Sequence, residues 1–150
     1  MTTFLISGGR GLVGKSLAQM LRRQGHKVYK LTRYPKRKGH VQWNPEKQSI
    51  DEKHLHKVEV IINLAGANIA ERKWSKNRKV DLINSRVSSI NFLKSSAKKM
   101  PKLNYYISAS GINCYGYNKH TEKIESDEYG DDFLSELVQE WERASNSFQE

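Results

Sequence analysis

The stretch Ser7-Gly8-Gly9-Arg10-Gly11-Leu12-Val13-Gly14 decides the fold of this chain of 150 residues. It follows an apolar segment, Thr3–Ser7, whose composition predicts a short buried strand. It leads into Gly11–Gln24, where apolar residues recur four apart and predict a helix that ends just before Gly25. The glycines therefore lie between a strand and a helix, where backbone amides and a helix N-terminus can bind phosphate.

The spacing of these glycines fits a dinucleotide-binding loop. Gly9, Gly11 and Gly14 satisfy G-x-G-x-x-G, and Gly8 with the last two satisfies G-x-x-G-x-x-G. One glycine permits the tight turn, one lets the backbone approach a pyrophosphate, and Gly14 lets the helix pack closely on the strand. The alternative is a glycine-rich turn that binds no ligand. The loop residues predicted to contact a cofactor are Ser7, Gly8, Gly9, Arg10, Gly11, Leu12, Val13 and Gly14.

The end of the second predicted strand, Lys27–Thr32, indicates which dinucleotide is bound. A site for NAD carries an acidic residue there that accepts a hydrogen bond from the ribose 2′-hydroxyl. This chain has Thr32 followed by Arg33 and no acid. Arg33 and Arg10 could bracket a 2′-phosphate, which favours NADP(H) over NAD(H). The alternative is that both arginines are simply solvated.

The remaining segments alternate between strand and helix patterns, which predicts an α/β fold with a parallel sheet and right-handed crossovers. No internal repeat, low-complexity tract or Gly/Ser linker divides the chain, so residues 1–150 are predicted to form one domain. The further predicted elements are a short strand at Val41–Trp43, a buried strand at Val58–Leu64, a helix from Ser75 to about Lys99, a strand at Tyr105–Ser110, and a helix capped by Asp131 or Asp132 with Phe133, Leu137, Trp141 and Phe148 on one face.

Composition excludes some classes of protein and leaves others open. No apolar run reaches the roughly 18–20 residues that cross a bilayer, and the N-terminus does not resemble a signal peptide. The single cysteine, Cys114, and the scattered histidines predict no metal site, and a cytoplasmic location is the expectation. The net charge of +10 invites phosphate-bearing partners. Nucleic acid remains a less favoured partner because no basic helix carries an aromatic ladder.

Three motifs resemble the short-chain dehydrogenase/reductases. Asn63-Leu64-Ala65-Gly66 resembles the N-x-A-G motif at the end of their fourth strand. Ser108-Ala109-Ser110 resembles the serine-bearing end of their fifth strand, with Tyr115-Gly116 following as in the extended branch. Narrower segments resemble the atypical subgroup of NAD-dependent epimerase family proteins. These segments are Ala65–Ala70, Arg72–Ser75, Asn84–Val87, Gly130–Leu134 and Trp141-Glu142.

The resemblance implies a Rossmann-type doubly wound sheet and a set of site residues. It places Leu64, Ala65, Gly66 and Ser108 against the cofactor and Ser110 at the catalytic serine position. It places Asn68 and Arg86 near the substrate. In the superfamily a Tyr-x-x-x-Lys pair on the following helix transfers the proton. Here Leu134 and Val138 stand at those positions, so the usual acid/base pair is absent.

Two aromatic residues have open interpretations. Tyr115 begins a literal Tyr-x-x-x-Lys sequence with Lys119, but the intervening glycine and asparagine predict a loop, so Tyr115 is only a weak catalytic candidate. Trp43 is either a wall of the adenine pocket or a half-buried aromatic that packs under a loop.

Proteins of this superfamily are about twice as long, so the chain is expected to be the N-terminal cofactor-binding portion of a longer protein. We expect cofactor affinity with little turnover from it. The functional expectation is an NADP(H)-dependent oxidoreductase or epimerase-like protein acting on an unknown small molecule. The alternative is a non-catalytic NADPH-binding or redox-sensing protein, and the oligomeric state is left open.

Overall fold

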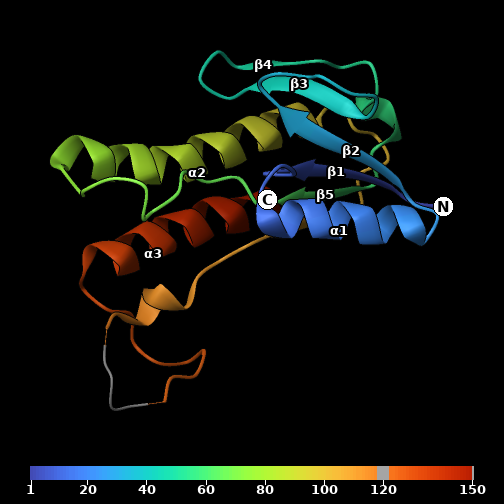
Figure 1. Ribbon diagram of the computed structural model, residues 1–150. Coiled ribbons are helices and arrows are strands. Elements are labelled where there is room, and N and C mark those ends of the chain that lie inside the picture. The colour runs from blue at the N-terminus through green and yellow to red at the C-terminus, as the bar shows by residue number, and fades with distance from the viewer. Residues whose placement is uncertain (118–121, 150) are drawn as a thin grey trace. The chain divides into compact units, whose positions relative to one another are not determined.

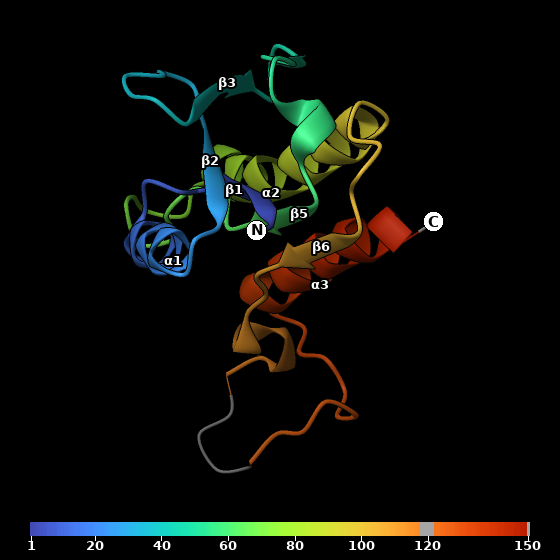
Figure 2. The same ribbon diagram turned by 90° about the vertical axis from the view of Figure 1, so that its right-hand side faces the viewer.

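The computed structural model describes residues 1–117 and 122–149 and contains a six-stranded sheet with helices on both faces (Figures 1 and 2). The strands are β1 (Thr3–Ser7), β2 (Lys27–Thr32), β3 (His40–Asn44), β4 (Ser49–Ile50), β5 (Val60–Asn63) and β6 (Tyr105–Ser108). The longer helices are α1 (Leu12–Arg23), α2 (Lys76–Ala97) and α3 (Phe133–Asn146). Single helical turns lie at η1 (Leu55–Lys57), η2 (Ile112–Tyr115) and η3 (Ser147–Gln149).

The sheet has the strand order β4-β3-β2-β1-β5-β6, and its pairs are parallel except for β3 with β4. Helix α1 connects β1 to β2, and α2 connects β5 to β6, so each crossover joins parallel strands. Helix α1 and the second half of α2 cover opposite faces of the sheet (Figures 1 and 2). The predicted α/β fold of the Rossmann type is therefore confirmed.

The contacts of the chain divide it into two compact units. Unit 1 comprises Met1–Gly66 and Ser88–Ala109, and it contains the sheet, α1 and the second half of α2. Unit 2 comprises Ala67–Val87 and Ser110–Glu150, within which the structure describes residues up to 117 and from 122 to 149. Helix α2 is continuous through both units.

The core of unit 1 follows from the alternation of side chains along parallel strands. The side chains of the sheet that pack with Ala18 and Leu21 of α1 are Ile6, Val28, Val60 and Ile62. Leu5 and Ile61 point to the other face and are completely buried, as are Ile90 and Leu93 in the second half of α2.

Unit 2 is organised by the N-terminus of α3. The Asp132 carboxylate accepts a hydrogen bond from the amide of Ser135 at 2.9 Å, which is the cap predicted from the sequence. Leu137 and Trp141 form the buried face of the helix, as predicted. Phe148 does not continue that face, because α3 ends at Asn146 and Phe148 lies in η3.

Four short elements, β4, η1, η2 and η3, were absent from the prediction. Strand β4 is two residues long, and η1 is a polar turn with one buried side chain, Leu55, so neither has a periodic pattern. Strand β5 begins at Val60 rather than at the predicted Val58. Within residues 1–117 and 122–149, no helix has the length and apolar character needed to span a membrane.

Candidate functional site

The loop between β1 and α1 is closed by backbone contacts that require glycine. The amide of Gly11 donates to the carbonyl of Gly8 at 2.9 Å. Gly8 has a φ of +64°, and a Cβ there would lie 2.4 Å from the carbonyl oxygen of Leu64 at the end of β5. A Cβ on Gly14 would lie 2.6 Å from the Gly8 carbonyl oxygen. The packing role predicted for Gly14 is therefore visible in the structure.

The first turn of α1 leaves its amide groups available for an anion. Its N-cap is Gly11, which has no side chain to accept from them, and the turn contains no acidic residue. Leu12 and Val13 are 86% and 64% exposed. This exposed turn has the donors and the dipole direction that phosphate oxygens need.

The loop forms one side of a pocket of about 450 Å³, and the end of β2 forms the other. The lining residues are Gly8, Gly9, Arg10, Gly11, Leu31, Thr32, Arg33 and Tyr34. The structure thus brings together six of the residues predicted from sequence, from the glycine loop and from the end of β2. Ser7, Leu12, Val13 and Gly14 are not among the lining residues.

Sequence reasoning missed Leu31 and Tyr34 as lining residues of this pocket. The sequence pattern indicates only a strand position for Leu31 and gives Tyr34 no role. Their position at the carboxyl end of β2, on either side of Thr32 and Arg33, was the available signal, because ligands of such sheets bind outside the carboxyl ends of the strands.

The surroundings of the pocket are strongly basic. The lining residues include two arginines and no acid. Burial, then the charges of Arg22 and Lys15, lower the pKa of Lys30, whose side chain lies beside Gly9. Burial and neighbouring cations also lower the pKa of His40. The protonated forms of these basic side chains are destabilised by one another and by burial. An anionic ligand would relieve this repulsion, so the surroundings of the pocket favour an anion.

Ser7 supports the pocket from beneath and is fully buried. Its hydroxyl donates to the Asn63 side-chain oxygen and accepts from the amide of Leu64 at 3.2 Å. The Asn63 amide nitrogen donates to the Tyr106 hydroxyl at 3.3 Å. This chain of bonds holds the start of the Leu64–Gly66 segment beside Gly8. Ser7 therefore acts here through Asn63 and Leu64, and its side chain is not free for a cofactor.

Trp43 does not lie in the pocket. It is buried and stacks on Phe92 of α2, with ring centroids 6.1 Å apart. Because side chains alternate along a strand, Trp43 points to the face of the sheet that the second half of α2 covers. The prediction that Trp43 forms a wall of the adenine pocket is therefore wrong, and the residue packs in the core.

The two serines at and after the end of β6, Ser108 and Ser110, make different hydrogen bonds. The Ser108 hydroxyl donates to the carbonyl of Ala109 at 3.0 Å. Ser110 is exposed, and its hydroxyl donates to the carboxylate of Glu142 on α3. Glu142 belongs to one of the segments that resemble the epimerase subgroup, but the sequence does not predict its pairing with Ser110. This pair places a hydrogen-bond acceptor directly on the serine.

Tyr115 lies in η2, and its ring is 6.2 Å from that of Tyr129. Burial, then the neighbouring Cys114, raise the pKa of the Tyr115 phenol. A catalytic tyrosine that accepts a proton needs the opposite shift. Asn118 and Lys119 lie outside the described residues, so the Tyr115–Lys119 sequence stays a prediction about a loop. Helix α3 contains neither tyrosine nor lysine.

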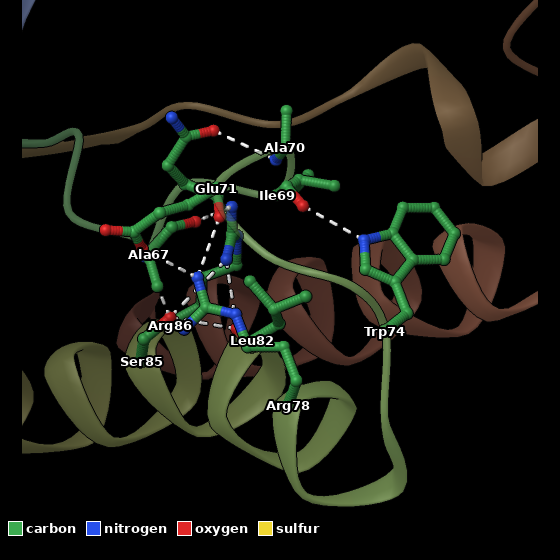
Figure 3. Close-up of polar contacts among 10 residues, drawn as sticks. Ala67, Ile69, Ala70, Glu71, Trp74, Arg78, Leu82, Ser85 and Arg86 are labelled. Atoms are coloured by element: carbon green, nitrogen blue, oxygen red, sulfur yellow. Dashed lines mark hydrogen bonds and ion pairs between the residues drawn. The ribbon is translucent and has the colours of Figure 1, made fainter.

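Arg86 and Asn68, the predicted substrate residues, lie in unit 2. Arg86 is 6% exposed, and its guanidinium donates to the carbonyl oxygens of Leu82 and Ala67 at 2.9 and 3.3 Å. Asn68 is exposed, and its carbonyl accepts from Arg78 at 2.8 Å. Figure 3 shows both guanidinium groups between α2 and the loop that begins at Ala67. The structure therefore brings these two residues to one loop–helix junction.

No group of three or more histidine, cysteine or acidic side chains suited to a metal occurs within residues 1–117 and 122–149. Cys114 is buried and free. The chemistry that these residues offer is phosphate binding at the glycine loop and anion or hydroxyl contacts in unit 2.

Comparisons with known proteins agree with this geometry. The family described as NAD dependent epimerase/dehydratase matches residues 4–133. An epimerase family protein of Mycobacterium leprae is 33% identical over 141 residues, which cover 93% of this chain and 46% of that protein. The chain spans about half the length of the curated relatives that it matches.

Two solved structures share the fold and about a third of the sequence. The human epimerase family protein SDR39U1, solved with NADPH, superposes with a TM-score of 0.82 at 30% identity, covering 96% of this chain and 48% of that one. A nucleoside-diphosphate sugar epimerase from Corynebacterium glutamicum has a TM-score of 0.82 at 32% identity, covering 99% of this chain and 31% of that one. The chain belongs to the NAD-dependent epimerase/dehydratase family, as an atypical short-chain dehydrogenase/reductase.

Proposed function

We propose that the pocket at the glycine loop binds NADP(H), and that residues 1–150 are the cofactor-binding domain of an oxidoreductase or nucleotide-sugar-epimerase-like protein. The observation that carries the proposal is the lining of one pocket by the glycine loop together with Arg10 and Arg33, without an acid. A 2′-phosphate carries negative charge and matches a guanidinium in shape. The human relative was solved with NADPH, which supports the same cofactor here.

Each part of the pocket has a role in this proposal. The amide of Gly9 and those of the exposed first turn of α1 would hold the pyrophosphate, since the amide of Gly11 is bonded to Gly8. Arg10, Thr32 and Arg33 would hold the adenosine ribose and its 2′-phosphate. Bound NADP(H) supplies hydride transfer, and the residues of this chain bind and orient it.

The position of the substrate is proposed from the residues at and after the carboxyl ends of β5 and β6. The segment Leu64–Gly66 and Ser108 would contact the nicotinamide half of the cofactor. Ser110, oriented by its bond to Glu142, would position the substrate oxygen. Tyr115 stays a weak candidate for the same pocket, and Asn68 and Arg86 are proposed to contact the substrate.

Calorimetric titration of NADPH and NADH into the chain and its arginine variants tests the proposal. Removing one charge-assisted bond in Arg33→Gln or Arg10→Gln should weaken NADPH by about 10- to 150-fold, the equivalent of roughly 1.5–3 kcal/mol. NADH, which has no 2′-phosphate, should change far less.

Arg23→Gln is the matched control, because it removes the same charge from the exposed last turn of α1, at the opposite end from the loop. It should leave both affinities within about twofold, as expected for a distant screened charge. Equal losses of NADPH and NADH in Arg33→Gln, or no binding of either by the unaltered chain, would refute the proposal.

The second candidate function is a non-catalytic NADPH-binding or redox-sensing protein. The specific observation in its favour is that α3 has Leu134 and Val138 and contains no tyrosine or lysine. Binding of NADPH without its oxidation, when nucleotide sugars and simple carbonyl compounds are added, would favour this function. Measurable oxidation would favour the enzyme. A reducing cytoplasm is the proposed location, since the sole cysteine is buried and free.

A further inference from the structure

A second basic site lies in unit 2, where two arginines of α2 lie under the loop that follows β5 (Figure 3). Arg86 is 6% exposed, and its Nη2 makes only a long bond of 3.3 Å to the carbonyl of Ala67. The side chain of Arg78 is 11% exposed, and its Nη2 donates to the carbonyl of Asn68 and to the carboxylate of Glu71. In both guanidinium groups Nε has no partner.

Trp141 of α3 completes this cluster. Its ring lies 5.0 Å from Arg86 Cζ, and its indole nitrogen also has no partner. Across the described part of the chain, the buried side-chain nitrogen and oxygen atoms without a hydrogen bond are Arg78 Nε, Arg86 Nε and Trp141 Nε1. All three are donors, and all three belong to one cluster. Buried donors are normally paired, so their concentration here indicates a missing acceptor.

The charges point to an anion rather than to a neutral acceptor. The carboxylate of Glu71 pairs with Arg78, and Arg86 has no carboxylate partner within residues 1–117 and 122–149. Burial, then the charge of Arg78, lower the pKa of Arg86, which nevertheless stays protonated at neutral pH. The edge formed by Nε and Nη2 is the one that binds carboxylate and phosphate with two parallel hydrogen bonds.

Glu71 occupies part of this site and can leave it. Its side chain is 53% exposed, while the arginine that it contacts is mostly buried. It lies on an irregular loop that the two arginines hold through the carbonyls of Ala67 and Asn68. Movement of that loop would expose the unpaired Nε edges.

We propose that Arg78 and Arg86 bind an oxyanion group of a small molecule, a carboxylate or a phosphate, and that Glu71 holds its place in the absence of that ligand. Only one part of this inference rests on the proposed function, namely that the bound anion is the substrate of the protein. It assigns that substrate to the class of anionic molecules. The site consists wholly of unit 2 residues, so its existence does not depend on the glycine loop.

The test follows the indole N–H resonance of Trp141 in ¹H–¹⁵N spectra of the chain, assigned by its loss in Trp141→Phe. Inorganic phosphate and malonate are titrated separately at constant ionic strength, with sodium chloride as the balancing salt. The titrations use an Arg33→Gln background, which weakens phosphate binding at the glycine loop, and the Trp141 signal reports on unit 2. Saturable movement of the Trp141 signal is expected. Saturation by phosphate, by malonate or by both supports the proposal and identifies the group bound.

The variants separate an anion site from a structural cluster. Arg86→Lys keeps the charge but loses the paired donors and should weaken the anion by about tenfold or more. Arg78→Gln should also weaken it. Glu71→Gln removes the competing carboxylate and should tighten the anion about two- to fivefold, the value of an exposed ion pair. Arg72→Gln, which removes an exposed charge next to Glu71, is the matched control and should leave the affinity unchanged.

Two results would overturn the inference. One is a Trp141 shift that is linear in salt and equal in all variants, as expected if water satisfies the three donors. The other is unchanged or weaker anion binding in Glu71→Gln. If Arg86→Lys fails to fold, Arg78→Gln and Glu71→Gln still decide the outcome. NADPH titration of the unaltered chain is scored separately, so loss of the cofactor proposal and loss of the anion site are distinguishable.

Discussion

Gly8 is the position at which the nucleotide loop is expected to be least tolerant of substitution. Alanine there meets two separate obstacles in the structure. Its φ of +64° is a left-handed conformation, which costs an L-residue roughly 1–2 kcal/mol. Its Cβ would lie 2.4 Å from the Leu64 carbonyl oxygen and 2.6 Å from the carbonyl carbon, both of which are backbone. Relieving such overpacking costs roughly another 1–3 kcal/mol.

The expected loss for Gly8→Ala is therefore about 2–5 kcal/mol, which corresponds to a melting temperature lowered by roughly 4–20 °C in a domain of this size. Two matched variants separate its components. Gly25 has a φ of +82° with nothing within 4 Å, so Gly25→Ala carries the conformational cost alone. Gly14→Ala carries the steric cost alone, since its Cβ would lie 2.6 Å from the Gly8 carbonyl oxygen at an ordinary φ.

The assay is thermal unfolding by far-ultraviolet circular dichroism, repeated in urea to obtain free energies. Gly25→Ala should lose roughly 1–2 kcal/mol at most, and Gly8→Ala should lose clearly more. A Gly8→Ala melting temperature equal to that of Gly25→Ala would refute the reasoning. It would show that the approach of Leu64 to the loop is not tight in solution, and the argument for a preformed pocket would lose its geometric basis.

Three further measurements probe other parts of the structure. Ser7→Ala removes the donor to the buried Asn63 side chain and should lower the free energy of unfolding by about 1–3 kcal/mol, and an unchanged urea midpoint would contradict this network. Asp132→Ala removes the cap on the Ser135 amide and should cost about 1 kcal/mol, most of which Asp132→Asn should restore. Burial and neighbouring cations lower the pKa of His40 below its ordinary value of about 6.5, so the unfolded chain takes up the proton first. The contribution of His40 to stability is therefore complete above that pH and is lost as the pH falls below it; the pH dependence of urea midpoints should become shallower in His40→Gln.

The fold could be predicted from the sequence wherever a buried pattern was long enough to be distinctive. Strands β1 and β2 have the predicted bounds, because their apolar residues face helices on both sides of a parallel sheet. The caps at Gly25 and Asp132 were also predicted, since each has its own conformational or hydrogen-bonding reason. Strand β4 could not be, because two residues that pair only with β3 have no period to detect.

The residues of the candidate site were likewise predictable only where the signal is local in the sequence. The glycine loop and Arg33 were predictable because their chemistry is local in sequence. Trp43 could not be assigned from the sequence, because the residue on which it packs, Phe92, lies far along the chain. The Ser110–Glu142 bond and the Glu71–Arg78 ion pair could not be predicted either, because each depends on how a helix is oriented against a loop.

The hydrogen bonds from Ser7 through Asn63 to Tyr106 also help to specify how the strands pair with one another. An amide side chain has one accepting end and one donating end, so Asn63 can pair with a hydroxyl on each side of it across the sheet. If β5 slipped by one residue along β1, Asn63 would face Ile6 and its buried amide would be left unpaired, at a cost of roughly 1–3 kcal/mol. A polar residue in the centre of an apolar sheet therefore helps to specify the strand register. The valines and isoleucines around it cannot do so, because they are interchangeable.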